Sequence, residues 1–266
     1  MDHRWILTVP EYYARLNSYL LGPFAMGPEE QSQDRDEWIA SLRGILGESV
    51  GRSVLDCSCG WGTQTVPLAM LGWQVTACDI SATSMESARR YAKEEGVSVE
   101  FRLCDMRDLA QVFDRQFDWA VSCYALYEIP DEEDLHQAAR GMFGALKPGG
   151  KCYLHLRDMD ELMEDQPRHV FLGERRLSNG RVLWIQDWDF ESETQVVALD
   201  AFLSENEDLD PSDHFRWTTE TIGVRKRVLY KAELQSLLDS AGFNPVTFLP
   251  KPVPWANVEV VATRPE

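Results

Sequence analysis

Between residues 53 and 157, short apolar runs alternate with longer segments whose apolar residues recur at helical spacing. The apolar runs are typical of buried strands and cover 53–56, 74–79, 97–104, 117–124 and 151–157. The segments between them predict helices over 65–71, 81–95 and 132–146, the last followed by the helix-ending Pro148-Gly149-Gly150. Strands that alternate with helices at this spacing predict a parallel sheet with helices on both faces.

The pattern changes outside this region. The first 35 residues are aromatic and irregular, and a helix is predicted only from residue 36 to residue 46. After Arg157, β-rich runs cover 170–177, 181–190, 194–202 and 215–229, and Ser178-Asn179-Gly180 is a hairpin signal. These runs predict an antiparallel addition to the sheet. A helix over 231–241 and strands over 245–249 and 257–263 close the chain.

The net charge of the chain limits the classes of partner that we expect. It has 26 basic and 44 acidic residues, a net charge of −18. A field of this sign repels phosphates, so neither nucleic acid nor an anionic membrane surface is an expected partner. The excess is concentrated in residues 158–213, which hold 16 acidic and four basic residues. Two interpretations stay open: a solvated surface insert, or a field that attracts a cationic substrate.

The cysteines favour a reducing compartment. Six of them occur, with no Cys-x-x-Cys pair and no histidine at zinc-finger spacing. We therefore expect reduced, mostly buried thiols, no metal site and a cytoplasmic protein. The N-terminus has no basic region followed by an apolar run, so no signal peptide is expected.

Candidate chemistry begins at the turn Asp56-Cys57-Ser58-Cys59-Gly60-Trp61-Gly62, between the first strand and its helix. Small residues let the backbone approach a ligand, and N–H groups at the helix start face it. Asp79 ends the second strand, where a carboxylate can accept both hydroxyls of a ribose. Thr65 stands where a dinucleotide motif has its third glycine. The acid Asp56 also precedes the first glycine, so a positively charged ligand fits this turn better than a nicotinamide cofactor. A tight turn without a ligand stays the other alternative.

With these features, the sequence resembles the class I S-adenosylmethionine-dependent methyltransferases, strongly over residues 50–157 and weakly over 230–264. The markers are the glycine turn, Asp79-Ile80-Ser81, Cys104-Asp105-Met106, Phe117-Asp118 and Leu146-Lys147-Pro148-Gly149-Gly150. The resemblance implies a Rossmann-like, seven-stranded, mostly parallel sheet with helices on both faces, plus an antiparallel β insert after strand five. It divides the chain into a substrate-covering arm (1–46), a cofactor-binding core (47–157), an acidic insert (158–230) and a C-terminal helix and hairpin that complete the sheet (231–266).

The same resemblance implies roles for single residues. The turn of Asp56 and Gly62 would hold the methionyl group, with backbone contacts from Ser58 and Gly60. Asp79 would bind the ribose, and Asp105 the adenine amino group. Ile80 and Met106 would cover the adenine, Cys123 would lie near the transferred methyl, and Arg35 would reach the cofactor carboxylate. The product would be S-adenosylhomocysteine. Plain core packing is the alternative for Ile80 and Met106.

Within the class, the chain is most similar to glycine N-methyltransferases and related small-amine enzymes. Tyr12, Tyr13 and Tyr19 resemble their substrate-covering arm, and Arg157 would hold a substrate carboxylate through its planar fork. Tyr124 and Glu128 replace the asparagine and the histidine of that family, so an acceptor other than glycine is implied. Trp5, Trp184, Trp188 and Trp217 could form an aromatic wall for a methylated ammonium, or pack the insert on the sheet.

We therefore expect methylation of a small molecule, a cationic amine or an amino acid, at nitrogen. Tyr124, Glu128 or water would deprotonate the amine. O-methylation is the alternative; it needs a base near the nucleophile, and His155 is the candidate. A protein that binds S-adenosylmethionine without transferring methyl is a further alternative. A homo-oligomer is compatible with the sequence.

Overall fold

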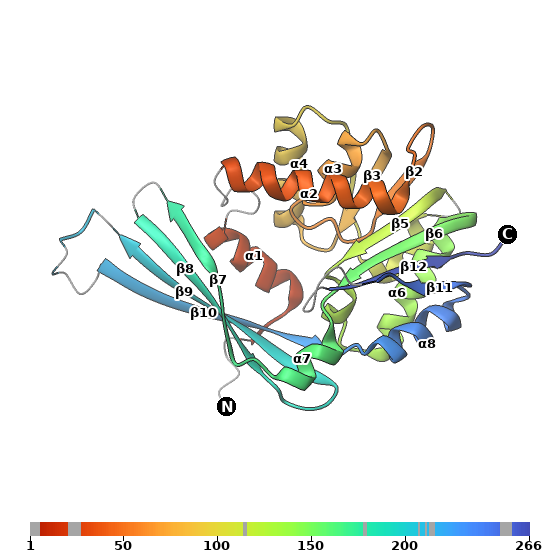
Figure 1. The fold of residues 1–266 in the computed structure, drawn as a ribbon. Coiled ribbons are helices and arrows are strands. Elements are labelled where there is room, and N and C mark those ends of the chain that lie inside the picture. Colours follow the sequence, from red (N-terminus) through yellow and green to blue (C-terminus); the bar gives the residue numbers. More distant parts are fainter. Residues whose placement is uncertain are drawn as a thin grey trace.

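The computed structural model describes residues 6–20, 28–113, 116–177, 180–206, 208–210, 212, 216–250 and 257–266; for 17–20, 28–33 and 175–177 it describes the backbone alone. These residues form one sheet of seven strands and one of five. Helices pack around the larger sheet, and helix α1 (Val9–Leu20) lies between the two sheets (Figure 1).

The seven-stranded sheet is mostly parallel. Its order is β11-β12-β6-β5-β2-β3-β4, and β12 runs antiparallel to both of its neighbours. The bounds are β2 Ser53–Asp56, β3 Gln74–Asp79, β4 Glu100–Leu103, β5 Phe117–Cys123, β6 Leu146–Leu156, β11 Val246–Phe248 and β12 Val258–Thr263. The predicted Rossmann-like sheet is confirmed, including its antiparallel last strand.

Helices cover both faces of this sheet because successive strand residues point to opposite sides. Val54 of β2 packs in one core cluster with Leu42 of α2. The next residue, Leu55, packs in a second cluster with Leu135 of α6. The helical segments are α2 Pro28–Leu46, α3 Thr65–Met70, α4 Ala82–Glu94, η2 Met106–Asp108, α5 Leu109–Val112, η3 Leu126–Glu128, α6 Glu132–Ala145, α7 Met159–Asp165 and α8 Lys231–Ala241.

The five-stranded sheet has the order β1-β10-β9-β8-β7, and the insert supplies all of its strands except β1. The four strands after α7 are antiparallel, as predicted: β7 His169–Leu177, β8 Gly180–Asp189, β9 Gln195–Asn206 and β10 Trp217–Arg227. The expected hairpin residues Ser178 and Asn179 lie outside the described residues. Phe202 and Val224 of this sheet belong to the same core cluster as Leu154 of β6, so the insert and the larger sheet share a continuous core.

The N-terminal segment is more regular than the sequence predicted. Ile6–Leu7 forms β1, which pairs with β10 in parallel, and α1 follows from Val9 to Leu20. Glu11 accepts hydrogen bonds from the backbone N–H and the hydroxyl of Thr8, which orders the start of this helix. The expectation of an irregular arm was wrong here, because α1 is stabilised by tertiary partners far away in the chain.

All six cysteines are buried and free of disulfides, as predicted. Among the described residues, no helix is both long enough and apolar enough to cross a membrane.

Candidate functional site

A cavity of about 1050 Å³ opens at the carboxyl ends of the parallel strands. Ser58 follows β2 in its lining, Asp79 ends β3, Asp105 follows β4 and Cys123 ends β5. Ligands of open α/β sheets bind at these strand ends. Tyr13 of α1 and Val224 of β10 line the cavity as well, so the N-terminal helix and the insert help to enclose it.

The glycine turn is held by Asp79. One carboxylate oxygen of Asp79 accepts the N–H of Gly60 at 2.8 Å, and the other accepts the N–H of Ser81 at 2.8 Å. Burial raises the pKa of this carboxyl. Gly60 and Gly62 have φ of 48° and 91°, a region that favours glycine. A Cβ on Gly62 would also lie 3.2 Å from Ala88 of α4, so this position packs the turn closely against a helix.

Asp56 lies behind the turn and is not part of the cavity lining. It is 1% exposed, and it accepts hydrogen bonds from the Thr65 hydroxyl at 2.6 Å and the Ser58 N–H at 3.3 Å. Burial raises the pKa of its carboxyl to about 6. Asp56 and Gly62 therefore shape the turn, while Ser58 and Gly60 present it to the cavity.

Three further predicted residues meet at the next strand end. Ile80, 41% exposed, and Met106 line the cavity beside Asp105. The Asp105 carboxylate accepts two side-chain hydrogen bonds from Arg107, at 3.0 and 2.6 Å. Burial opposes ionisation of Asp105, but the hydrogen bonds from Arg107 outweigh it and lower the carboxyl pKa. An exposed apolar side chain next to a fixed carboxylate suits a flat heterocycle that carries an amino group.

Glu128 forms the opposite wall of the cavity together with Tyr13. Its Oε1 accepts hydrogen bonds from the Tyr13 hydroxyl at 3.0 Å and from Lys226 of β10. Glu128 is 6% exposed, and its Oε2 has no hydrogen-bond partner among the described residues. A buried carboxylate oxygen without a donor favours a ligand that brings an N–H or O–H group to it.

Tyr124 and His155 line the same end of the cavity. Tyr124 has φ of 58°, a left-handed conformation that is rare for a bulky residue. Its backbone N–H donates to the carbonyl of His155 at 2.7 Å, and its hydroxyl lies 2.9 Å from His155 Nε2. The structure thus brings the candidate base His155 next to Tyr124.

Several predicted site residues lie away from the cavity. The Arg157 guanidinium stacks over the Trp188 ring at 5.1 Å and is absent from the lining, contrary to its expected role as a carboxylate clamp. Arg35 is also absent from the lining and pairs at 3.0 Å with Glu95, the residue that follows α4, so it links α2 to the end of α4. The side chain of Tyr19 is outside the described residues.

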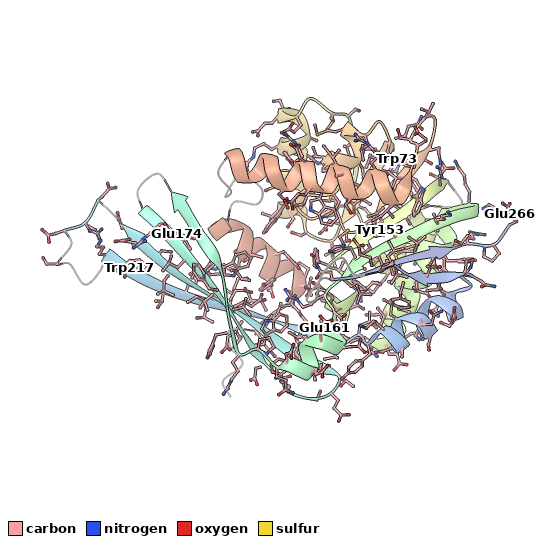
Figure 2. The ribbon with its side chains drawn as sticks, in the orientation of Figure 1. Trp73, Tyr153, Glu161, Glu174, Trp217 and Glu266 are labelled. Carbon is pink, nitrogen blue, oxygen red and sulfur yellow. The ribbon has the colours of Figure 1, made fainter. Side chains whose placement is uncertain are left out.

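The expected aromatic wall does not form either. Trp188 is buried, and Trp184 stacks on Phe202 and donates to Asp200 at 2.7 Å. Trp217 lies at the outer end of the insert sheet, away from Tyr153 of the larger sheet (Figure 2). Trp184 and Trp188 pack against the shared core, as in the alternative, whereas Trp217 is 38% exposed. Trp5 is outside the described residues.

The sequence analysis missed several residues that line the cavity. Trp38 and Trp61 are among them, as are Gln64 and Asn257. Trp61 stands inside the quoted glycine turn and could have been found there. Asn257 and the buried Lys226 gave no signal, because a single polar residue in a β-rich segment reads as a surface position.

Comparison with known proteins agrees with this geometry. Residues 54–150 match the methyltransferase domain family. Ubiquinone biosynthesis O-methyltransferase from Xanthomonas axonopodis pv. citri is 39% identical over 108 residues, which are 40% of this chain and 44% of that protein. The chain thus spans less than half the length of this curated relative.

Solved structures resemble the chain over nearly all of its length. DesVI from Streptomyces venezuelae has a TM-score of 0.67 at 16% identity, covering 96% of this chain and 98% of its own. CalS10 from Micromonospora echinaspora, described as an amino pentose methyltransferase with bound S-adenosylmethionine, has a TM-score of 0.64 at 15% identity, covering 87% and 90%. Residues 54–150 are therefore similar to the methyltransferase domain family, and the chain has the fold of the class I S-adenosylmethionine-dependent methyltransferases.

Proposed function

We propose that the protein transfers a methyl group from S-adenosylmethionine to a small-molecule acceptor. The observation that carries this proposal is one continuous cavity. Its lining combines Ser58, Gly60, Asp79 and Asp105 from the strand-end loops with Tyr13 of α1 and with Tyr124 and Glu128 after β5. Methyl transfer is an in-line displacement, so an enclosed site that aligns donor and acceptor provides the main catalytic contribution.

The residues present fit the methyl donor. Ser58 and Gly60 would hold its methionyl group, Asp79 the ribose, and Ile80, Asp105 and Met106 the adenine, with Cys123 at the turn toward the acceptor. Asp79 and Asp105 each have lone pairs left beyond the hydrogen bonds that they accept in the protein. When bound, the sulfonium of the donor supplies the activated methyl and leaves as a neutral thioether.

We favour a hydroxyl group as the acceptor. The O-methylation hypothesis required a base beside the nucleophile, and His155 lies in the cavity wall next to Tyr124. The curated relative is also named as an O-methyltransferase. An amino acid held by Arg157 is less favoured, since that guanidinium stacks over the Trp188 ring and is not in the cavity lining.

N-methylation of an amine is the second candidate. The observation in its favour is the buried, unpartnered Oε2 of Glu128, which would accept an N–H from an amine. The acidic lining of the cavity adds a field that attracts cations, with Asp34 and Glu37 among its residues.

The first test is isothermal titration of S-adenosylmethionine into wild type, Asp79→Ala and the control Asp239→Ala on the outer face of α8. Asp79→Ala removes a charged acceptor, worth about 1.5–3 kcal/mol per hydrogen bond, so its affinity should fall at least about tenfold. The control should bind like wild type. A folded wild-type protein that binds no S-adenosylmethionine would refute the proposal.

The acceptor class is tested by incubating the protein with S-adenosylmethionine and catechol, 3,4-dihydroxybenzoate, phenethylamine or glucosamine. Mass spectrometry of the products shows whether oxygen or nitrogen carries the new methyl. Methylated phenols support the first candidate, and methylated amines alone would replace it with the second.

A further inference from the structure

A chain of hydrogen bonds runs from the cavity wall into the larger sheet. The Tyr124 hydroxyl lies 2.9 Å from His155 Nε2, and His155 Nδ1 lies 3.2 Å from Glu259 Oε1. Tyr124 follows β5, His155 lies on β6 and Glu259 on the neighbouring β12, where it is directly opposite His155 in the antiparallel register. Three adjacent strands therefore fix the spacing of the chain.

The direction of these hydrogen bonds follows from Glu259. Its hydrogen bond with His155 is the largest influence on its carboxyl and lowers the pKa, although burial opposes this. An ionised carboxylate can only accept, so the proton of a neutral imidazole belongs on Nδ1. Nε2 then has a free lone pair, to which the Tyr124 hydroxyl donates. Tyr153 supports this arrangement by donating to Glu259 at 2.8 Å.

The Tyr124 oxygen keeps one lone pair for the cavity. A phenol oxygen has one proton and two lone pairs. The proton goes to His155, and one lone pair accepts the amide N–H of Asn257 at 2.6 Å. Burial raises the pKa of Tyr124 to about 12, so the hydroxyl stays protonated and can only act by passing its proton on as it receives another.

We propose that Tyr124, His155 and Glu259 form a proton relay that deprotonates the acceptor. The acceptor's O–H or N–H bond breaks, its electron pair becomes available for the methyl, and its proton goes to the Tyr124 oxygen. The proton of Tyr124 passes to His155 Nε2, and Glu259 stabilises the resulting imidazolium. Tyr124 is the catalytic residue, while His155 and Glu259 act through it. This relay rests on the proposed methyl transfer.

The left-handed backbone at Tyr124 is consistent with this role. Such a conformation is unfavourable for a bulky residue and is kept where the surroundings impose it. Here the His155 carbonyl accepts the backbone N–H of Tyr124, and the His155 ring hydrogen-bonds with the Tyr124 hydroxyl. The other titratable groups around the relay include Tyr153 of β6, Tyr127 of η3, Cys123 of β5, Asp34 and Glu37 of α2, and Arg157 after β6.

The tautomer of His155 tests the relay without any substrate. Long-range ¹H–¹⁵N NMR of the histidine rings, with the His155 signals assigned from a His155→Gln variant, should show Nδ1 protonated and Nε2 unprotonated at pH 8. Tyr124→Phe should move the Nε2 signal, and Glu259→Gln should disturb the tautomer. A proton on Nε2 in the wild-type protein would overturn the proposal.

Kinetics test the catalytic role with the acceptor that is methylated fastest in the panel above. General-base catalysis contributes about 10²–10⁴-fold, so Tyr124→Phe should lower kcat by at least about 10²-fold at pH 7. For a phenol, the loss should shrink as the pH rises, because the acceptor then ionises by itself. Tyr230→Phe, whose hydroxyl donates to the Glu193 carbonyl outside the cavity, is the matched control.

The outcomes separate the relay from the proposed function. A Tyr124→Phe loss that is equal at every pH would indicate a packing role and refute the relay, while methylation itself would stand. Absence of S-adenosylmethionine binding to the wild-type protein would refute methyl transfer, and the NMR measurement would still decide whether the hydrogen-bond chain exists as described.

Discussion

At the scale of single residues, the two carboxylates that contact the glycine turn, Asp56 and Asp79, differ in what they can reach. The resemblance implied that both contact the methyl donor, Asp56 through the turn around the methionyl group and Asp79 at the ribose. In the structure, Asp79 lines the cavity, whereas Asp56 is enclosed by Thr65 and Ser58. Sequence spacing identifies such residues, but only packing decides which of them can reach a ligand.

The stability of the protein should depend on pH through Asp56. Its pKa is about 6 in the folded protein and about 3.9 in an unfolded chain, so the folded state holds this proton more tightly. The stability that it adds is present below pH 4 and is lost as the pH rises through 6. Asp56→Asn removes this titrating carboxyl, so it no longer contributes to the pH dependence of the free energy of unfolding. The variant should therefore gain about 1 kcal/mol relative to wild type between pH 5 and 7.5, as measured by urea unfolding.

Asp118→Asn is the control for that series. Burial opposes ionisation of Asp118, but hydrogen bonds from Ser53 and Lys147 outweigh it and lower the pKa. This carboxyl is already ionised in both states above pH 5, so the difference from wild type should stay constant over the same range. A flat difference for Asp56→Asn as well would contradict the assignment of a raised pKa to this residue.

At the scale of elements, local pattern explains most of the fold. The predicted helix over 231–241 agrees with α8, which ends at Gly242 in a left-handed conformation, and the strand over 74–79 agrees with β3. Local pattern did not predict helix α1, because its aromatic residues contact partners far away in the chain. Tyr12 donates to the fully buried Asp200, and Tyr13 donates to Glu128. The signal that could have revealed it is Thr8-Val9-Pro10-Glu11, a capping-box sequence.

The residues of the candidate site also divide into those that local sequence predicts and those that only distant contacts bring together. The residues at the strand ends that were expected to hold the methyl donor follow from spacing along the chain, and most of them line one cavity. The acceptor end could not be predicted in the same way. It is assembled from α1, η3, β10 and the residues around β12, and sequence contains no rule for which residues of such distant elements meet.

The contact between η3 and β10 should be a strong link between the larger sheet and the insert. Lys226 and Glu128 are both buried and paired. Lys226→Met would leave a buried carboxylate without its cation, which costs about 3–5 kcal/mol. The double variant Glu128→Gln/Lys226→Met should recover most of this loss in urea unfolding. Arg225→Met, which breaks the more exposed pair with Glu191, should cost less than about 1 kcal/mol. Equal costs for the two single variants would show that burial of the pair is unimportant.

At the scale of the whole molecule, the net charge of −18 should distinguish the methyl donor from its product. S-adenosylmethionine carries one more positive charge than S-adenosylhomocysteine, and the cavity lining includes Asp34, Glu37 and Asp134. Raising NaCl from about 20 to about 300 mM shortens the screening length, so the affinity for S-adenosylmethionine should fall roughly threefold. The affinity for S-adenosylhomocysteine, titrated in parallel, should change much less. Equal salt dependence for both would exclude a role for the acidic field in selecting the donor.

The pairing of β1 with β10 has a consequence for the order in which the protein folds. Ile6 lies opposite Gly223, so this pairing joins two residues that are 217 positions apart in the chain (223 − 6). Contacts of such long separation form late, and domains start to fold from the N-terminal side during synthesis. During synthesis, the strand ends of β2 to β5 can assemble while the insert strands β7 to β10 are still being made. Under the proposed function, the nascent chain would hold the methyl donor before the acceptor side of its site is complete.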